Sequence, residues 1–119
     1  MSVDSRHYLI YGYNLTGMDT DKFEDWKWSD EGEEYTSDQI PGKVQIFYDP
    51  MSGCHLYLGH IFASVCAFEG DSVKINDDDI ATAKATVPGH LRYLQEIGVI
   101  TKDPHFNPKL EMILFEECT

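Results

Sequence analysis

Two runs that favour β-structure, residues 43–48 and 54–67, are separated by Asp-Pro-Met-Ser-Gly at positions 49–53. Proline early in a turn fixes φ, and glycine adopts positive φ without strain. Val, Ile, Phe and Tyr are frequent in both runs, as is typical of strands. The pattern therefore predicts a β-hairpin. Gly59 and the length of the second arm leave room for a bulge.

Two more strands and a short helix follow from local residue patterns. Residues 6–15 and 109–117 are rich in strand-forming residues. The first run is apolar on both faces, which indicates a central strand. Asp19 or Thr20 is placed to cap a short helix over residues 20–28. Acidic residues crowd its first turn, where the helix dipole favours negative charge.

The strongest helical pattern starts at the three aspartates 77–79, one of which is expected to be the cap. Gly98, followed by an apolar residue, is expected to end the helix. Pro88 interrupts the pattern, so one kinked helix and two separate helices are both possible. The residues that repeat at helical spacing are Ile80, Ala83, Val87, Leu91 and Leu94.

The segment 29–42 is predicted to be a loop, because its residues are polar and it ends in Pro41-Gly42. Such long connections are uncommon in compact domains and are often functional or mobile. A further turn is predicted at Glu69-Gly70-Asp71. The predicted order of elements is therefore β-α-β-β-α-β, which is the order of ferredoxin-like folds.

Length and composition indicate a single folded domain over residues 1–119. Apolar residues make up 42% of the chain, which is too rich for a disordered chain. We therefore expect the α+β class, with an antiparallel sheet and the helices on one of its faces.

The net charge of −12 limits the kinds of partner. It disfavours direct binding to nucleic acid or anionic lipid, which need Lys and Arg on the contact face. It favours association with basic surfaces. No apolar run approaches the roughly 18 residues of a membrane helix, and the first residues lack an apolar signal core. We expect a complete cytoplasmic chain with no membrane contact and no cofactor.

Cysteines and histidines offer few arrangements for chemistry. The chain has 3 cysteines, and an odd count without a signal peptide indicates free thiols. Cys54, His60 and Cys66 share one side of a strand, but neighbours among them lie about 20 Å apart, whereas zinc ligands lie about 2 Å from the ion. Cys54 and His55 point to opposite faces, so they cannot form a nucleophile and base pair. No metal site or catalytic residue is predicted.

Residues 10–16, Ile-Tyr-Gly-Tyr-Asn-Leu-Thr, resemble the first-strand motif of RNA-recognition domains. Those domains also fold β-α-β-β-α-β, and their third strand alternates basic and aromatic residues. Residues 54–62 contain no Lys or Arg. RNA binding is therefore not expected.

Acidic residues are concentrated between Thr16 and Gln39, where nine carboxylates and two lysines give −9 + 2 = −7 of the net −12. The segment lacks the ligand spacing of an EF-hand. Aromatic residues are interleaved with the carboxylates, and exposed Trp and Tyr often anchor protein interfaces. Trp26 could instead be a residue of the hydrophobic core rather than an interface anchor. The predicted partner-binding residues are Asp19, Asp21, Glu24, Asp25, Trp26, Trp28, Asp30, Glu31, Glu33, Glu34 and Tyr35.

Tyr48-Asp-Pro-Met-Ser-Gly53, followed by Tyr57-Leu-Gly59, resembles a hairpin motif of small uncharacterised bacteriophage accessory proteins. Those proteins read Tyr-Asp-Gly-Met-Ser-Gly, then an aromatic residue and a glycine, so Pro50 is a departure. The match covers about a dozen of 119 residues. It implies a phage origin rather than an activity. Small acidic phage proteins often disable host enzymes or defence systems, sometimes by mimicking the charge of nucleic acid.

Three functional expectations follow. The first is a non-enzymatic phage-type accessory protein that binds and modulates a host or defence protein with a basic surface. The second is a small-ligand-binding or enzymatic ferredoxin-like domain, with a pocket that draws on His7, His55, His60 or His90. The third is a structural, self-assembling subunit paired through an exposed strand edge. The sequence leaves the oligomeric state open.

Overall fold

The computed structural model describes residues 5–37, 40–49, 55–66, 74–103 and 105–118. Residues 50–53 of the turn predicted at 49–53, the turn predicted at 69–71 and Cys54 lie outside these residues. The described elements are β1 (Ser5–Asn14), α1 (Asp21–Trp26), α2 (Asp30–Ser37), β2 (Val44–Asp49), β3 (His55–Cys66), α3 (Asp77–Glu96) and β4 (Glu111–Cys118).

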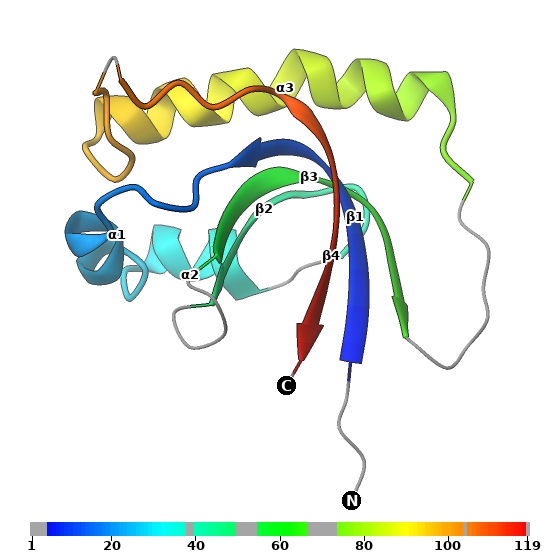
Figure 1. The fold of residues 1–119 in the computed structure, drawn as a ribbon, viewed down its shortest axis with the longest axis horizontal. Coiled ribbons are helices and arrows are strands. Elements are labelled where there is room, and N and C mark those ends of the chain that lie inside the picture. The colour runs from blue at the N-terminus through cyan, green and yellow to red at the C-terminus, as the bar shows by residue number, and fades with distance from the viewer. Residues whose placement is uncertain (1–4, 38–39, 50–54, 67–73, 104, 119) are drawn as a thin grey trace, which may run out of the picture.

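The strands form one antiparallel sheet of 4 strands in the order β2-β3-β1-β4 (Figure 1). The central position predicted for β1 is confirmed, because β1 pairs with both β3 and β4. The hairpin is also confirmed, with Val44 opposite His60 and Asp49 opposite His55. Leu9 pairs with Ala63 but Ile10 pairs with Ile61, so β3 carries one extra residue, a bulge, in its long arm.

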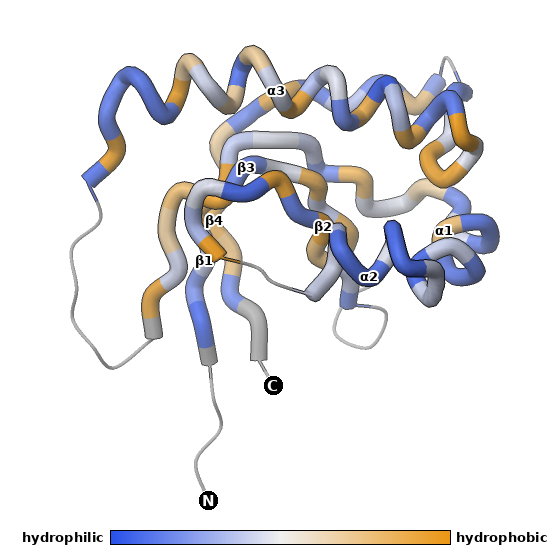
Figure 2. The backbone as a smooth tube through the Cα atoms, turned by 180° about the vertical axis from the view of Figure 1, so that it is seen from behind, coloured by the Kyte–Doolittle hydropathy of each residue, from blue (hydrophilic) through white to orange (hydrophobic). Residues whose placement is uncertain are grey.

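Helix α2 covers residues 30–37 of the segment predicted to be a loop over residues 29–42, so that prediction was wrong for these residues. Ser29 starts the helix: its hydroxyl accepts from the Gly32 N–H at 3.1 Å and donates to the Trp26 carbonyl oxygen at 2.6 Å. Acidic residues fill the first turn, where they are favourable to the helix dipole. Figure 2 shows α2 as largely hydrophilic, which is why its composition looked like that of a loop.

The described residues therefore form a compact α+β domain with a four-stranded antiparallel sheet and three helices. One more helix than predicted lies between β1 and β2. The ferredoxin-like arrangement stays a prediction. No helix among the described residues has the length and apolar content to cross a bilayer.

Helix α3 continues through Pro88 as one element (Figure 1), so the two-helix alternative was wrong. Its cap is Asn76 rather than one of the three aspartates: Asn76 Oδ1 accepts from the Asp79 N–H at 2.9 Å. A capping residue must be non-helical, and Asn76 is extended whereas the helix already includes Asp77. The end was predicted correctly, since Gly98 has φ of 85° and the Val99 N–H donates to the Leu94 carbonyl at 3.0 Å.

Apolar side chains pack on both faces of the sheet. The larger cluster joins strand residues such as Leu56 and Leu58 to Phe23 of α1 and to Val87 and Leu94 of α3. The smaller cluster lies on the other face and is mainly aromatic. Its buried members are Tyr8, Ile10, Phe47, Ile61 and Phe115. Because α2 packs against β2, the acidic segment lies at the β2 edge, opposite to β4.

Candidate functional site

The predicted partner-binding residues lie on α1, on α2 and in the connections beside these helices, but they do not share one environment. Glu24, Trp26, Glu31 and Tyr35 are partly buried. The others are exposed, namely Asp19, Asp21, Asp25, Trp28, Asp30, Glu33 and Glu34. The acidic segment therefore contains side chains that hold the fold together and side chains that face solvent.

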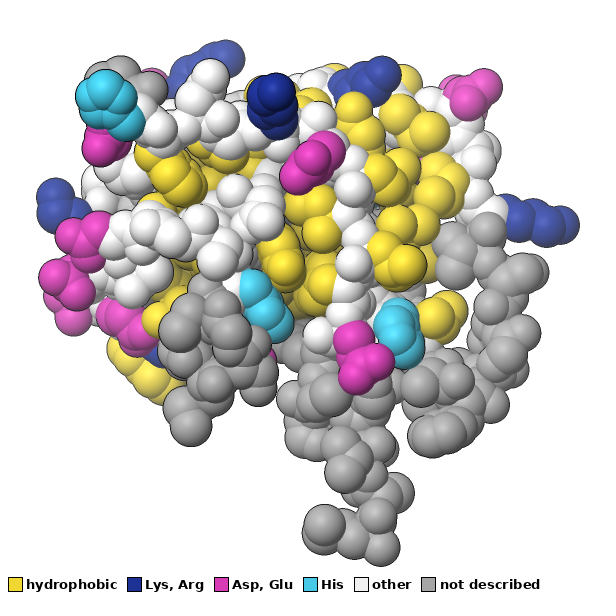
Figure 3. All heavy atoms as spheres, viewed as in Figure 1, with side chains coloured by type: hydrophobic (Ala, Val, Ile, Leu, Met, Phe, Trp, Pro, Cys, Tyr) yellow, Lys and Arg dark blue, Asp and Glu magenta, His cyan; other side chains and the backbone are white. Residues whose placement is uncertain are grey.

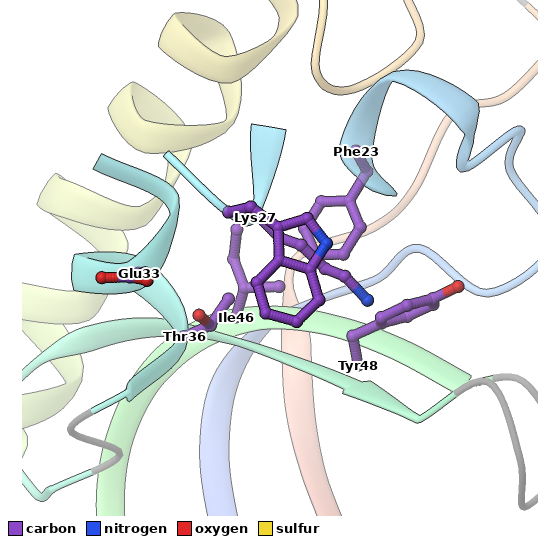
Figure 4. Close-up of a pocket in the computed structure, with 7 residues that line it drawn as sticks. Phe23, Lys27, Glu33, Thr36, Ile46 and Tyr48 are labelled. Carbon is purple, nitrogen blue, oxygen red and sulfur yellow. The ribbon is translucent and has the colours of Figure 1, made fainter. Parts of the chain in front are cut away.

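A groove of about 310 Å³ lies between α1, α2 and β2, beside Trp28 (Figure 4). Phe23 and Ile46 contribute buried apolar surface to it. The Trp28 side chain is 74% exposed, so its indole lies outside the core. Burying apolar surface of this kind contributes about 25 cal/mol per Å². The residues that line the groove are Phe23, Lys27, Trp28, Glu33, Thr36, Ile46 and Tyr48.

Lys27 and Glu24 neutralise each other beside this groove. Lys27 Nζ lies 2.8 Å from Glu24 Oε2, 5.2 Å from the Trp28 ring centroid and 5.1 Å from the Tyr48 ring centroid. The Tyr48 hydroxyl donates to Glu24 Oε1. Hydrogen bonds from Lys27 and then Tyr48 hold the pKa of Glu24 below its ordinary value. Glu24 therefore stays ionised, with its charge offset inside the protein.

A second group of side chains ties α2 to α3. Trp26 Nε1–H donates to Glu31 Oε1 at 3.2 Å, and the Tyr93 hydroxyl donates to Glu31 Oε2 at 2.6 Å. The Tyr35 oxygen and His90 Nδ1 are 2.6 Å apart. Burial raises the pKa of Tyr35 and lowers the pKa of His90, so both groups are neutral near pH 7. These contacts hold Trp26 and Tyr35 in place and leave Trp28 as the most accessible of the three predicted anchors.

Asp19 and Asp21 lie in a different hollow, of about 500 Å³, near the end of α3. Lys22 and Lys102 also line this hollow, so its charge is mixed. The carboxylates that remain exposed on α1 and α2 without belonging to that hollow are Asp25, Asp30, Glu33 and Glu34.

The four histidines considered for a ligand pocket lie in separate surroundings. His7 Nε2 is 3.0 Å from Glu116 Oε2, and the His55 ring stacks on Tyr57 with centroids 5.2 Å apart. His60 is buried, and its ring lies 5.3 Å from that of Phe62. His90 lines a hollow of about 370 Å³ together with Tyr35 and Gln45. The ligand-binding alternative stays a prediction. Within the described ranges no cluster of three His, Cys, Asp or Glu side chains could hold a metal ion.

Several residues that line the groove or connect α2 to α3 lie outside the acidic segment and were not predicted as site residues. Tyr48 and Ile46 come from β2, and His90 and Tyr93 come from α3. Alternation along β2 places Ile46 and Tyr48 on one face, but no local pattern links that face to Trp28. Comparisons with protein-family models, curated proteins and solved structures found no match. Function is therefore inferred from the geometry and charge of this surface.

Proposed function

We propose that this chain is a non-enzymatic protein-binding module that docks the exposed part of α1 and α2 on a basic surface of another protein. The observation that carries the proposal is Trp28, which is 74% exposed beside an apolar-floored groove and next to exposed carboxylates in the chain. Tryptophan is enriched among the residues that contribute most to interface affinity.

The two parts of the surface would have different tasks. Trp28 would be buried against the partner and would supply most of the affinity. Asp25, Asp30, Glu33 and Glu34 would surround it and attract basic side chains, which mainly raises the association rate and the specificity. Binding would therefore weaken as the salt concentration rises, because exposed charges are screened.

The class of partner is suggested by the resemblance of the hairpin to phage accessory proteins. A host or defence protein with a basic surface is the first class to test, and the protein would then act in the cytoplasm of the host cell. A nucleic-acid-binding partner would be the choice if the carboxylates mimic phosphates. In either case the contact is with a protein and not with nucleic acid or membrane.

The test compares three immobilised baits in bacterial lysate, with elution by stepped salt and identification by mass spectrometry. The second bait neutralises the exposed carboxylates, as Asp25→Asn, Asp30→Asn, Glu33→Gln and Glu34→Gln. The third makes the matched change on α3, as Asp77→Asn, Asp78→Asn, Asp79→Asn and Glu96→Gln. Each variant removes four negative charges, so −12 becomes −12 + 4 = −8 in both.

Wild type and the α3 variant are expected to capture the same dominant partner and release it at the same salt step. The α1–α2 variant is expected to lose it or release it at lower salt. Equal loss in both variants would show that only total charge matters, which contradicts a localised surface. Equal retention in all three baits would also contradict the proposal.

A further inference from the structure

The second edge of the sheet, formed by β4, carries exposed apolar side chains. Met112 is 41% exposed and Leu114 is 69% exposed. They lie opposite Tyr11 and Leu9 of β1, and directly paired residues project from the same face of a sheet. Figure 3 shows hydrophobic side chains gathered over the β1 and β4 region of the face in view. Among the described residues β4 pairs with β1 alone, so residues 111–115 have a neighbouring strand on one side and none on the other.

An open strand edge with apolar side chains is a template for another strand. We propose that β4 pairs antiparallel with β4 of a second copy of this chain, with Ile113 of one copy opposite Ile113 of the other. The result is a dimer with one continuous sheet. This inference concerns the edge of the sheet opposite to β2 in the strand order and does not depend on the proposed function.

Backbone geometry limits the possible registers. In an antiparallel sheet the N–H and C=O of successive residues point alternately to one neighbouring strand and to the other. Two residues that lie opposite each other in the dimer must both have their backbone N–H and C=O pointing outward, or both pointing toward β1. Because this direction alternates along the strand, the residue numbers of the two partners are both odd or both even, and their sum is even. This rule excludes the register that would place Glu111 opposite Glu116.

Side-chain chemistry selects among the registers that remain. In the register centred on Ile113, residues 111–115 of the two β4 strands pair, and Met112 of one copy lies opposite Leu114 of the other. Centred on Leu114, Met112 would lie opposite Glu116, an apolar side chain against a charge. Centred on Met112, only residues 111–113 of the strand would pair. The Ile113 register also places Glu111 opposite Phe115, but of these three registers it alone pairs the two exposed apolar side chains, Met112 and Leu114, with each other.

The acidic α1–α2 surfaces do not lie at the interface of this dimer. The acidic α1–α2 surfaces lie at the β2 edges, which become the two outer edges of the joined sheet.

The test is sedimentation equilibrium in reducing buffer, which excludes disulfide-linked species, from low micromolar to near-millimolar protein. The wild type is expected to reach twice the chain mass of 13.6 kDa as concentration rises. Leu114→Glu places a carboxylate opposite Met112 of the second copy and is expected to stay monomeric. Met112→Lys combined with Leu114→Glu places a lysine opposite each new carboxylate and is expected to restore the dimer.

Three sedimentation results would overturn the inference: a wild type that stays monomeric throughout, a dimer that Leu114→Glu leaves intact, or a double variant that fails to dimerise. The last result would exclude the Ile113 register, because only that register brings positions 112 and 114 together. Circular dichroism confirms that each variant folds. Hydrogen exchange of the unaltered protein gives an independent readout: those of residues 111–115 whose N–H points away from β1 are expected to exchange more slowly at high concentration, and an unchanged rate for them would equally overturn the inference.

Discussion

At the level of single residues, two histidines combine burial with a neutral state. Burial lowers the pKa of His90 and the pKa of His60 below the ordinary value of 6.5, with Asp79 partly opposing the shift at His60. In the unfolded chain both side chains regain ordinary pKa values. The unfolded state therefore binds more protons than the folded state just below pH 6.5, and stability must rise with pH in that range.

The expected result is a free energy of unfolding that is full above about pH 7 and falls as the pH decreases through about 6 toward 5. His90→Gln removes one of the two groups and should make this dependence shallower. Urea denaturation at a series of pH values measures it. His105→Gln, at an exposed position, is the matched control and should keep the wild-type slope. An unchanged slope in His90→Gln would show that protonation of His90 is not linked to folding.

The aromatic residues show why the candidate site could be predicted only in part. The concentration of carboxylates with Trp26, Trp28 and Tyr35 was visible in the sequence. The sequence did not show that the two tryptophans have different surroundings. Trp26 is partly buried because it donates to Glu31 of α2 and packs against Tyr35 of the same helix, with ring centroids 5.6 Å apart. Those contacts exist only because α2 follows α1 so closely, and α2 itself was not predicted.

At the level of elements, long periodic patterns were reliable and short polar ones were not. The strand-forming runs of β1, β2 and β3 supply apolar residues to both faces of the sheet, and the helical repeat in α3 places its apolar residues on the face that packs against the sheet. Helix α2 has few apolar residues and depends on close packing instead: a Cβ on Gly32 would lie 2.2 Å from the Trp26 carbonyl oxygen. Such a contact requires glycine, but a glycine among acidic residues suggests a loop when only the sequence is known.

The contact between β1 and β3 also depends on glycine. The register places Gly12 opposite Gly59. A Cβ on Gly12 would lie 2.0 Å from the Leu58 carbonyl oxygen and 2.4 Å from Gly59 Cα. Both are backbone atoms, so no side-chain adjustment can relieve the overlap, and the two central strands would have to separate.

Gly12→Ala is therefore expected to destabilise the protein by about 2–4 kcal/mol. The control is Gly89→Ala on α3, where a Cβ meets no atom within 4 Å. That change should stabilise the protein by about 0.5–1 kcal/mol, the difference in helix propensity between glycine and alanine. Chemical denaturation measures both. A Gly12→Ala variant as stable as wild type would mean that β1 and β3 do not approach as closely as described.

At the level of the whole molecule, the sheet separates two surfaces of different chemistry. The β2 edge carries α2 and the acidic segment, and the β4 edge carries exposed Met112 and Leu114. Binding at the first surface and pairing at the second can therefore occur together. The strands were predictable from local pattern, but this separation depends on the strand order β2-β3-β1-β4, which only long-range pairing determines.

The most direct test of the central claim is the affinity of Trp28→Ala for the partner captured from bacterial lysate, measured by isothermal titration calorimetry at two salt concentrations. The exposed position means that stability should change by no more than about 0.5 kcal/mol. Affinity should fall by about 2 kcal/mol or more, which is about thirtyfold, whereas Ile97→Ala, at another exposed apolar position, should bind like wild type. Wild-type affinity in the Trp28→Ala variant would contradict the claim that Trp28 anchors the interface.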